Sequence, residues 1–310
     1  MSIHRVLAAS SLVLLLAACT PAIVPQSGPA AVVSPRTRAE PPMPLPNREG
    51  SLKFAAMGDS GNASQGQYQL ATQMAKTHQA FPFELVLMSG DNLIGSERPQ
   101  DYAEKFERPY QLLLDAKVLF FAALGNHDDR NQRYYKQFNM EGQRYYSFKA
   151  PRQNVRFFAL ESTYPEPTQI EWLERQLKES TDDWKVVFVH HPLYSSGGRH
   201  GSDIMLRKTL EPLFIRYNVS VVFAGHDHFY ERIKPQMGIA HFVLGSGGRL
   251  SAGDIDARSP LTARGFDADQ TFLVAEVFDD QMHFNAISRT GQIVDSGLIV
   301  RRQPPAAPAP

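Results

Sequence analysis

The sequence of 310 residues has a single cysteine, Cys19. It can therefore form no disulfide within the chain and no zinc site built on several thiolates. A metal site would have to use His, Asp, Glu, Asn or Tyr side chains. No His-Glu-x-x-His motif occurs, which argues against a zinc peptidase. The 32 basic and 32 acidic residues balance. No overall field attracts nucleic acid or an anionic membrane, and any phosphate must bind at a local site.

Residues 1–18 predict an export signal. A basic start with Arg5 precedes the apolar run Leu12–Ala18, which ends directly before Cys19. The run is shorter than the roughly 20 apolar residues that a membrane-spanning helix needs. The residues LAAC that end at Cys19 resemble a bacterial lipobox, which implies a lipidated Cys19 and a protein anchored in the cell envelope. A plain secretory signal with an incidental cysteine is the alternative.

Composition divides the rest of the chain into three parts. Residues 19–50 are rich in proline and alanine, have no aromatic residue, and predict an extended tether. Residues 303–310 are predicted to be a disordered tail for the same reason. The folded domain is therefore expected over residues 51–302.

Hydrophobic patterns within this domain predict a mixed α/β fold that ends in antiparallel strands. Strands are expected at Leu52–Met57, Phe83–Ser89, Val118–Leu124, Tyr145–Lys149, Arg156–Glu161, Lys185–His190, Ser220–Ala224, Ala240–Leu244, Phe272–Phe278, His283–Ser288 and Ile293–Val300. Helices are expected at Ser64–Gln79, with Ser64 as a possible N-cap, and at Gln100–Leu114, Thr168–Lys178 and Ser202–Tyr217.

Five of the expected strands run directly into polar clusters. These clusters are Gly-Asp at 58–59, Gly-Asp-Asn at 90–92, Gly-Asn-His-Asp at 125–128, His-His-Pro at 190–192 and Gly-His-Asp-His at 225–228. Ligand sites in α/β sheets form beyond the carboxyl ends of strands, so these five clusters are expected to share one crevice. Their oxygen and imidazole groups suit Mn, Fe, Zn or Mg. A carboxylate in such a crevice would be costly unless it met a cation.

The ordered clusters resemble those of the calcineurin-like metallophosphoesterases, most closely the purple acid phosphatases and their bacterial relatives. The segments GHDHFYER (225–232) and FVLGSGG (242–248) support that branch, and the resemblance covers residues 52–250. It implies a four-layer α/β/β/α sandwich, in which two mixed β-sheets are flanked by helices.

The resemblance also implies two metal ions, which would be Fe, Mn or Zn. Asp59 and His228 would bind the first ion, Asp91 would bridge both, and Asn126, His190 and His226 would bind the second. His127 would contact the phosphate and help to protonate the leaving oxygen. A hydroxide activated by the metals would attack phosphorus in line.

Two positions depart from the family pattern. Ile94 stands where the purple enzymes have a tyrosine, and Gly61 stands where many other members have a histidine. Neither residue can bind a metal through its side chain. We therefore expect weaker or more exchangeable binding at the first metal position and no tyrosinate absorption band.

Other histidines and one arginine lie in or near the clusters. His190 and His191 should point to opposite sides of an extended chain, and the family pattern selects His190 as the ligand. His191 is then a neighbour of the site or a packed residue. The resemblance places His200, in the loop 195–201, near the substrate. Arg199 in the same loop could contact phosphate, although a lone loop arginine is more often solvated.

These observations favour a phosphate-ester hydrolase, and a phosphomonoesterase most of all. A phosphodiesterase is a close alternative because the same metal centre serves both bond types. A non-catalytic envelope protein that binds a ligand on the same fold is a third hypothesis, prompted by the incomplete first metal position. Neither a nucleic acid nor a protein partner is expected.

Overall fold

The computed structural model describes residues 42–303. The predicted export signal, the tether up to residue 41 and the tail from residue 304 lie outside the described residues. Within the described range no helix is both long and apolar enough to cross a membrane.

The described residues form two mixed β-sheets. One sheet has six strands in the order β13-β12-β11-β1-β2-β3. Its strands are β1 (Leu52–Met57), β2 (Leu85–Ser89), β3 (Leu119–Ala123), β11 (Thr271–Phe278), β12 (Gln281–Ser288) and β13 (Ile293–Val300). The other has seven strands in the order β10-β8-β9-β7-β6-β5-β4. Its strands are β4 (Tyr146–Lys149), β5 (Val155–Leu160), β6 (Trp184–Val189), β7 (Val221–Ala224), β8 (Tyr230–Gln236), β9 (Ile239–Leu244) and β10 (Thr262–Phe266).

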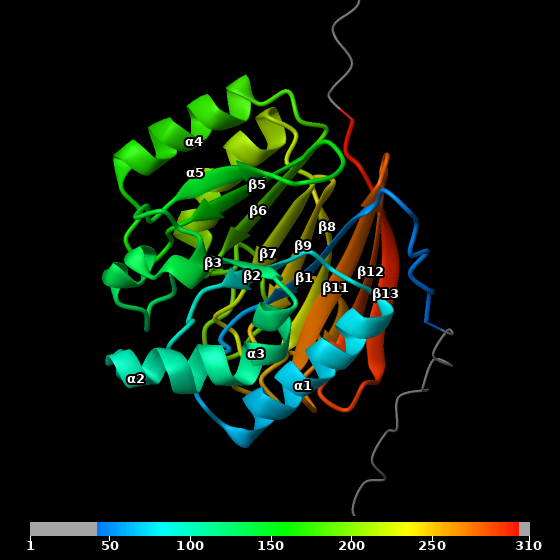
Figure 1. The fold of residues 1–310 in the computed structure, drawn as a ribbon. Coiled ribbons are helices and arrows are strands. Elements are labelled where there is room, and N and C mark those ends of the chain that lie inside the picture. Colours follow the sequence, from blue (N-terminus) through cyan, green and yellow to red (C-terminus); the bar gives the residue numbers. More distant parts are fainter. Residues whose placement is uncertain (1–41, 304–310) are drawn as a thin grey trace, which may run out of the picture. The chain divides into compact units, whose positions relative to one another are not determined.

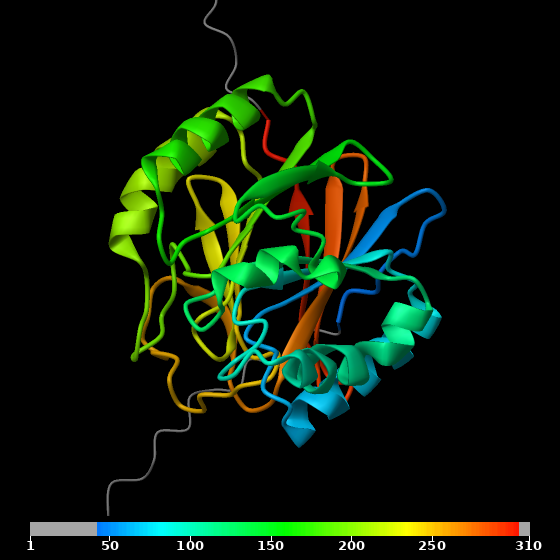
Figure 2. The same cartoon turned by 60° about the vertical axis from the view of Figure 1, so that its left-hand side comes forward.

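Helices cover the outer face of each sheet (Figures 1 and 2). The helices are α1 (Gln65–Ala80), α2 (Pro99–Tyr102), α3 (Arg108–Asp115), α4 (Pro167–Glu179) and α5 (Ile204–Arg216). Short 3-10 turns, η2 (Arg130–Tyr134) and η3 (Lys136–Phe138), follow β3. One apolar cluster joins α1 and α3 to the six-stranded sheet, and another joins α4 and α5 to the seven-stranded sheet.

A third apolar cluster lies between the two sheets. In β1, Phe54 and Ala56 face this inner layer, whereas Ala55 and Met57 face the helices. This is the alternation that a pleated strand imposes. The Phe54 ring packs edge-on against Phe157 from the other sheet, at a centroid distance of 5.4 Å. The four layers confirm the predicted α/β/β/α sandwich.

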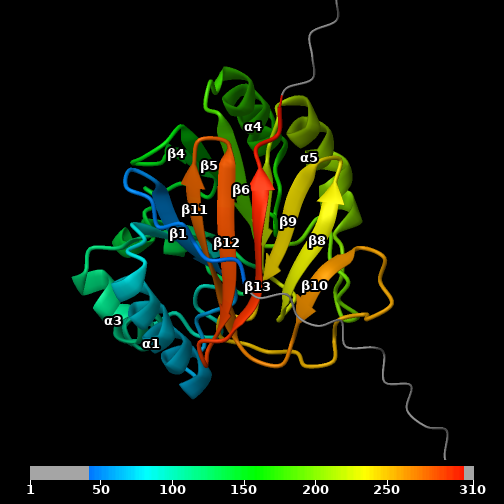
Figure 3. The same cartoon turned by 90° about the vertical axis from the view of Figure 1, so that its right-hand side faces the viewer.

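Two details differ from the expectations. Strands β8 and β10 are not predicted from the sequence; they pair with each other at the end of the seven-stranded sheet (Figure 3). The single helix expected over Gln100–Leu114 is interrupted by a π-helical turn, η1 (Ala103–Glu107). Pro109 explains the interruption, because it has no N–H to offer the carbonyl four residues earlier. That carbonyl, of Lys105, accepts instead from the Gln67 side chain at 2.5 Å.

The strand directions decide where the polar clusters meet. Strands β1, β2 and β3 are parallel neighbours, and so are β5, β6 and β7. Each group therefore ends at a single edge of its sheet. Gly225, just after β7, bonds to the His190 carbonyl, and Gly58, just after β1, bonds to the Leu244 carbonyl of the other sheet. The carboxyl ends of both groups thus meet at one edge of the sandwich.

Candidate metal centre

Six polar side chains meet at this edge, three from each sheet. Asp59, Asp91 and Asn126 follow β1, β2 and β3, while His190, His226 and His228 follow β6 and β7. These are the six residues that the sequence analysis selects as candidate ligands. Their potential ligand atoms lie around two points.

The candidate second metal position lies among Asp91, Asn126, His190 and His226. The Nε2 atom of His190 lies 2.8 Å from Asn126 Oδ1 and 3.5 Å from Asp91 Oδ1. The Nδ1 atom of His226 lies 3.1 Å from Asn126 Oδ1 and 3.2 Å from His190 Nε2. Nitrogen and oxygen donors therefore converge on one point from four residues.

His190 is oriented by the strand beside it. Its Nδ1 atom lies 3.0 Å from the Ser89 carbonyl oxygen, which can only accept. This contact assigns the ring proton to Nδ1 and leaves the Nε2 lone pair directed at the cluster. The Ser89 carbonyl, held in place within β2, thus fixes the His190 tautomer that can bind a metal through Nε2.

The candidate first metal position lies between Asp59 and His228. His228 Nε2 is 3.5 Å from Asp59 Oδ1. Asp59 is fully buried, and its Oδ1 has no hydrogen-bond partner among the described residues. Its other oxygen accepts from the His226 backbone N–H at 2.8 Å. A buried carboxylate oxygen without a partner is costly, and a cation at this point would satisfy it.

The electrostatics of the cluster also fit a cation. Burial, followed by the charge of Asp91, raises the pKa of Asp59 well above its usual value. Burial lowers the pKa of His190. Burial and then the neighbouring His190 lower the pKa of His226 to about 2. Burial and then the charge of Arg249 lower the pKa of His228 to about 4. Neutral imidazoles beside buried carboxylates form the donor set that Mn, Fe or Zn accepts.

Three of these six residues adopt the left-handed backbone conformation. The φ angles are 55° at Asp59, 52° at Asp91 and 71° at His226. This region is unfavourable for residues other than glycine, and strain of this kind concentrates at functional sites. At these turns the chain bends sharply beyond the strand and aims its side chain into the crevice.

Asp128 holds two of the loops together. Its carboxylate accepts backbone N–H groups of Asn92, Leu93 and Gly125 at 3.0, 3.0 and 2.8 Å. It thereby links the loop after β2 to the loop after β3. Burial, followed by the charge of Asp91, raises its pKa to about 7. This role is not predicted from the sequence, in which Asp128 is only the last residue of the cluster at 125–128.

The other predicted histidines surround the second position. His127 is exposed, and its backbone N–H donates to Asp91 Oδ1 at 3.0 Å. The exposed His200 ring lies 4.3 Å from the His226 ring. The His191 ring also lies 4.3 Å from that of His226, and its Nδ1 lies 2.8 Å from Ser162 Oγ. His191 reaches the cluster because β6 ends at Val189, so strand alternation no longer separates it from His190.

The backbone itself occupies the space beside Gly61. A Cβ atom at this position would lie 1.7 Å from the Asn92 carbonyl oxygen. The buried Ile94 follows in the same loop, and its N–H donates to the Gly61 carbonyl at 2.7 Å. The two departures from the family pattern therefore belong to one local arrangement. This arrangement leaves no room for a ligand side chain at position 61.

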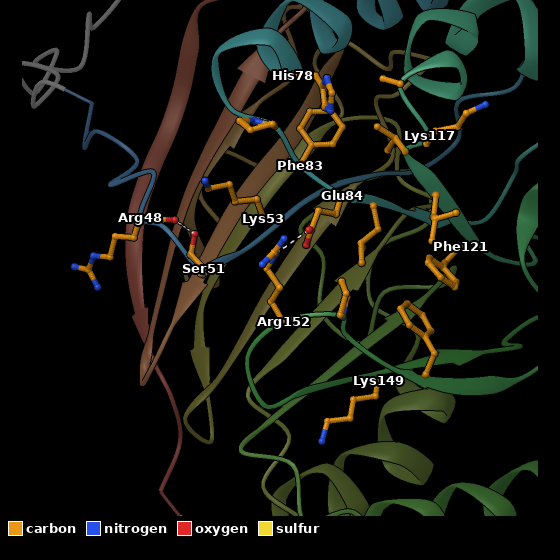
Figure 4. A pocket seen from close by; sticks show the side chains of 18 of the residues that line it. Arg48, Ser51, Lys53, His78, Phe83, Glu84, Lys117, Phe121, Lys149 and Arg152 are labelled. Carbon is orange, nitrogen blue, oxygen red and sulfur yellow. Dashed lines mark hydrogen bonds and ion pairs between the residues drawn. The ribbon is translucent and has the colours of Figure 1, made fainter.

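A cavity of about 900 Å³ lies away from the cluster, near the amino ends of β1, β2 and β3 (Figure 4). The basic residues of its lining are Arg48, Lys53, Lys117, Lys149 and Arg152. Its floor is apolar and includes Phe83 and Phe121. It contains none of the six candidate ligands, so its size does not mark the catalytic site.

Sequence comparison relates the chain to known phosphatases. The calcineurin-like phosphoesterase family matches residues 52–230, which include all five polar clusters. Rabbit (Oryctolagus cuniculus) tartrate-resistant acid phosphatase type 5 is 27% identical over 247 residues, covering 66% of this chain and 76% of the relative. Purple acid phosphatase 3 of Arabidopsis thaliana is 26% identical over 270 residues, covering 76% and 74%.

Structural comparison gives the same fold. A purple acid phosphatase from yellow lupin (Lupinus luteus) seeds superposes with a TM-score of 0.67 at 20% identity, covering 83% of this chain and 55% of that one. Because the family match spans more than half of the chain and every strand-end cluster, the expected resemblance is confirmed: this chain belongs to the calcineurin-like phosphoesterase family and is a hydrolase.

Proposed function

We propose that the protein is a phosphomonoesterase with a dinuclear metal centre. The convergence of six oxygen and nitrogen ligands from both sheets carries this proposal. Asp59 and His228 would hold one ion, Asn126, His190 and His226 the other, and Asp91 both. Bound Fe, Mn or Zn ions would supply Lewis acidity and activate water.

The residues around the ligands would handle the substrate. Asn126 is neutral and His190 is fixed with its lone pair facing the second position, so both can bind a cation without losing a proton there. His127 and His200 are exposed at the rim, where imidazoles can bind phosphate oxygens. His127, whose backbone is held by Asp91, would supply the proton that the leaving oxygen needs.

The acid phosphatases among the relatives support a monoester substrate. A diester substrate is the alternative. The purified full-length protein would be stripped of metal and reloaded separately with Mn, Zn and Fe. Release of nitrophenol from the phosphate monoester would then be compared with release from the bis-nitrophenyl diester. We expect metal-restored turnover with the monoester preferred.

Asp91→Ala provides the negative control, because it removes the carboxylate between the two positions. The matched variant Asp115→Ala alters an exposed residue at the end of α3 and should leave turnover unchanged. A preference for the diester would replace the monoesterase with a phosphodiesterase. Tight metal binding without turnover of either ester would favour the non-catalytic ligand-binding protein.

We also propose that the protein is exported and anchored in the cell envelope through lipidated Cys19. The motif LAAC after an apolar run supports this. In a bacterial host fed radioactive palmitate, the wild-type protein should incorporate label and fractionate with membranes. Cys19→Ser should lose both properties. An unlabelled wild-type protein recovered in the soluble fraction would refute the anchor.

A further inference from the structure

A second cavity, of about 430 Å³, borders the first metal position. His228 is part of its wall. Arg199 lies in the loop after β6, whereas Arg249 and Asp254 belong to the loop after β9, and all three line the cavity. A volume of this size accommodates a small organic ligand. The cavity therefore extends the candidate centre towards the side where its protein ligands are fewest.

The two arginines in this wall have no counter-ion. Among residues 42–303, neither Arg199 nor Arg249 makes a hydrogen bond or an ion pair, and Asp254 pairs with neither. Arg249 is half-buried, whereas Arg199 is exposed. Arg156, which is also partly buried, is by contrast paired with Asp182 at 2.6 Å. Two unpaired guanidinium groups that share one cavity favour an anionic ligand.

The loops that carry the arginines are joined to each other. Gly198 N–H donates to the Asp254 carbonyl at 2.8 Å, and Gly197 forms a β-bridge with Ile255. Ser251 N–H donates to the His228 carbonyl at 2.9 Å. These bonds tie both loops to the first metal position. The two loops that carry the arginines are thereby joined to each other and to the segment of His228.

We propose that Arg199 and Arg249 form a subsite for a second anionic group of the substrate. The proposal rests on the phosphomonoesterase function and specifies its substrate class: monoesters that carry a carboxylate or a second phosphate close to the ester. Metal ions held by the six candidate ligands would bind the phosphate group that is hydrolysed. The guanidinium groups, planar and bidentate, suit a carboxylate or another phosphate beside it.

Matched substrates test the subsite. Phosphoglycolate and ethyl phosphate differ by a carboxylate in place of a methyl group, and ethylene glycol bisphosphate places a second phosphate there. The wild-type protein should have a higher kcat/KM for phosphoglycolate or for the bisphosphate than for ethyl phosphate. Arg249→Ala should lower kcat/KM for phosphoglycolate and for the bisphosphate by about 10- to 100-fold, mainly through a higher KM, because a charge-assisted contact is lost. Turnover of ethyl phosphate should change far less.

Further variants identify the cause of any change. Arg199→Ala should also lower kcat/KM for phosphoglycolate. Asp254→Asn should raise the preference for phosphoglycolate over ethyl phosphate, because it removes a negative charge from the wall of the cavity. Arg108→Ala, on the exposed side of α3, is the control for loss of a positive charge. Equal losses for both substrates in Arg249→Ala would overturn the subsite, as would a wild-type protein that does not distinguish them.

A binding measurement separates failure of the subsite from failure of the proposed function. Phosphonoacetate and ethylphosphonate are not hydrolysed and differ by the same carboxylate. Calorimetry on the metal-loaded protein should show tighter binding of phosphonoacetate, and Arg249→Ala should remove the difference. If ethyl phosphate is not hydrolysed but this difference is found, the subsite stands and the hydrolase does not. Equal affinities for the two phosphonates would refute the subsite directly.

Discussion

At the scale of single residues, the crevice is built by backbone as much as by side chains. Gly61 is the clearest case, since the carbonyl of Asn92 occupies the place of its missing side chain. The small number of candidate ligands at the proposed first metal position therefore follows from the packing of this loop. A ligand cannot be restored there by exchanging one residue.

Gly61→His is accordingly expected to destabilise the fold by about 1–3 kcal/mol rather than to add a metal ligand, because the loop must move to admit any side chain. Chemical denaturation and metal analysis of the variant would measure both effects. Gly66→Ala is the comparison, because only the flexible end of Gln270 lies in its way. Unchanged stability with tighter metal binding in Gly61→His would contradict this expectation.

His241 predicts an acid-sensitive stability. It lies buried in β9, with its ring 5.0 Å from that of Tyr194. Burial, and then the charge of Arg207 on α5, lowers its pKa to about 3. An unfolded chain has a histidine pKa near 6.5, so it binds the proton first. The free energy of unfolding therefore falls as pH decreases from about 6.5 towards 3.

His241→Leu removes this contribution. Between about pH 7 and pH 5 the variant should lose about 2 kcal/mol less of its unfolding free energy than the wild type loses. Urea titrations at the two pH values would measure the difference. The partly exposed His283, changed to leucine in the same way, should alter the pH dependence much less. Equal pH dependence in wild type and His241→Leu would show that another group controls acid stability.

The sequence predicts some site residues and not others for a physical reason. All six candidate ligands directly follow recognisable apolar strands, so their meeting point follows from strand direction. Arg249 does not end such a strand. The role proposed for it rests on the absence of a partner among residues 42–303, which only the folded structure reveals. Asp128 acts through three backbone N–H groups, which no residue pattern records.

At the scale of elements, the π-helical turn η1 supports the loop that follows Asp59. Gln67, fully buried in α1, donates to the freed Lys105 carbonyl and accepts from the N–H groups of Asn62 and Ala63. One side chain thus joins η1 to the segment after Asp59. An unfavourable residue, Pro109, creates the acceptor that makes this link possible.

Gln67→Leu should therefore destabilise the protein by about 2–4 kcal/mol, since it leaves buried backbone groups without partners. Metal affinity at the first position should fall with it, because the loop from Asp59 loses its support. Thermal unfolding and metal titration would report the two effects. Gln111→Leu on the exposed face of α3 is the matched variant and should change neither.

Some element boundaries follow directly from the sequence. Strands β1 and β13 have the predicted bounds. Strand β8 escapes prediction because it carries Glu231, Arg232 and Pro235. The two charged side chains bond to Ser196 and Asp295, which lie far away in the sequence. Tertiary hydrogen bonds, rather than apolar alternation, thus stabilise this strand.

At the scale of the whole molecule, the candidate centre connects the two sheets. Asp59, Asp91 and Asn126 come from one sheet and the three histidines from the other. Bound metal should therefore oppose unfolding of the entire sandwich. At a free metal concentration of about 100 times Kd, each site adds about 2.7 kcal/mol.

Asp91→Asn should separate two effects of the Asp91 carboxylate, its repulsion of Asp59 and its binding of metal. In metal-free protein it should raise the melting temperature, because Asp59 no longer faces a second buried negative charge. It should also abolish most of the stabilisation that added Mn or Zn gives. Scanning calorimetry with and without metal would measure both changes. A metal-free variant less stable than the metal-free wild type would show that repulsion between the two carboxylates is minor.

The pairing of β1 has a consequence for biosynthesis. Leu52 of this first strand lies opposite Val277 of β11, so one neighbour of β1 is encoded near the end of the chain. A ribosome that adds about 5–20 residues per second completes most of the polypeptide before this neighbour exists. Until then β1 has an unpaired edge. Products of premature termination would thus lack a closed core and become targets for proteases and chaperones.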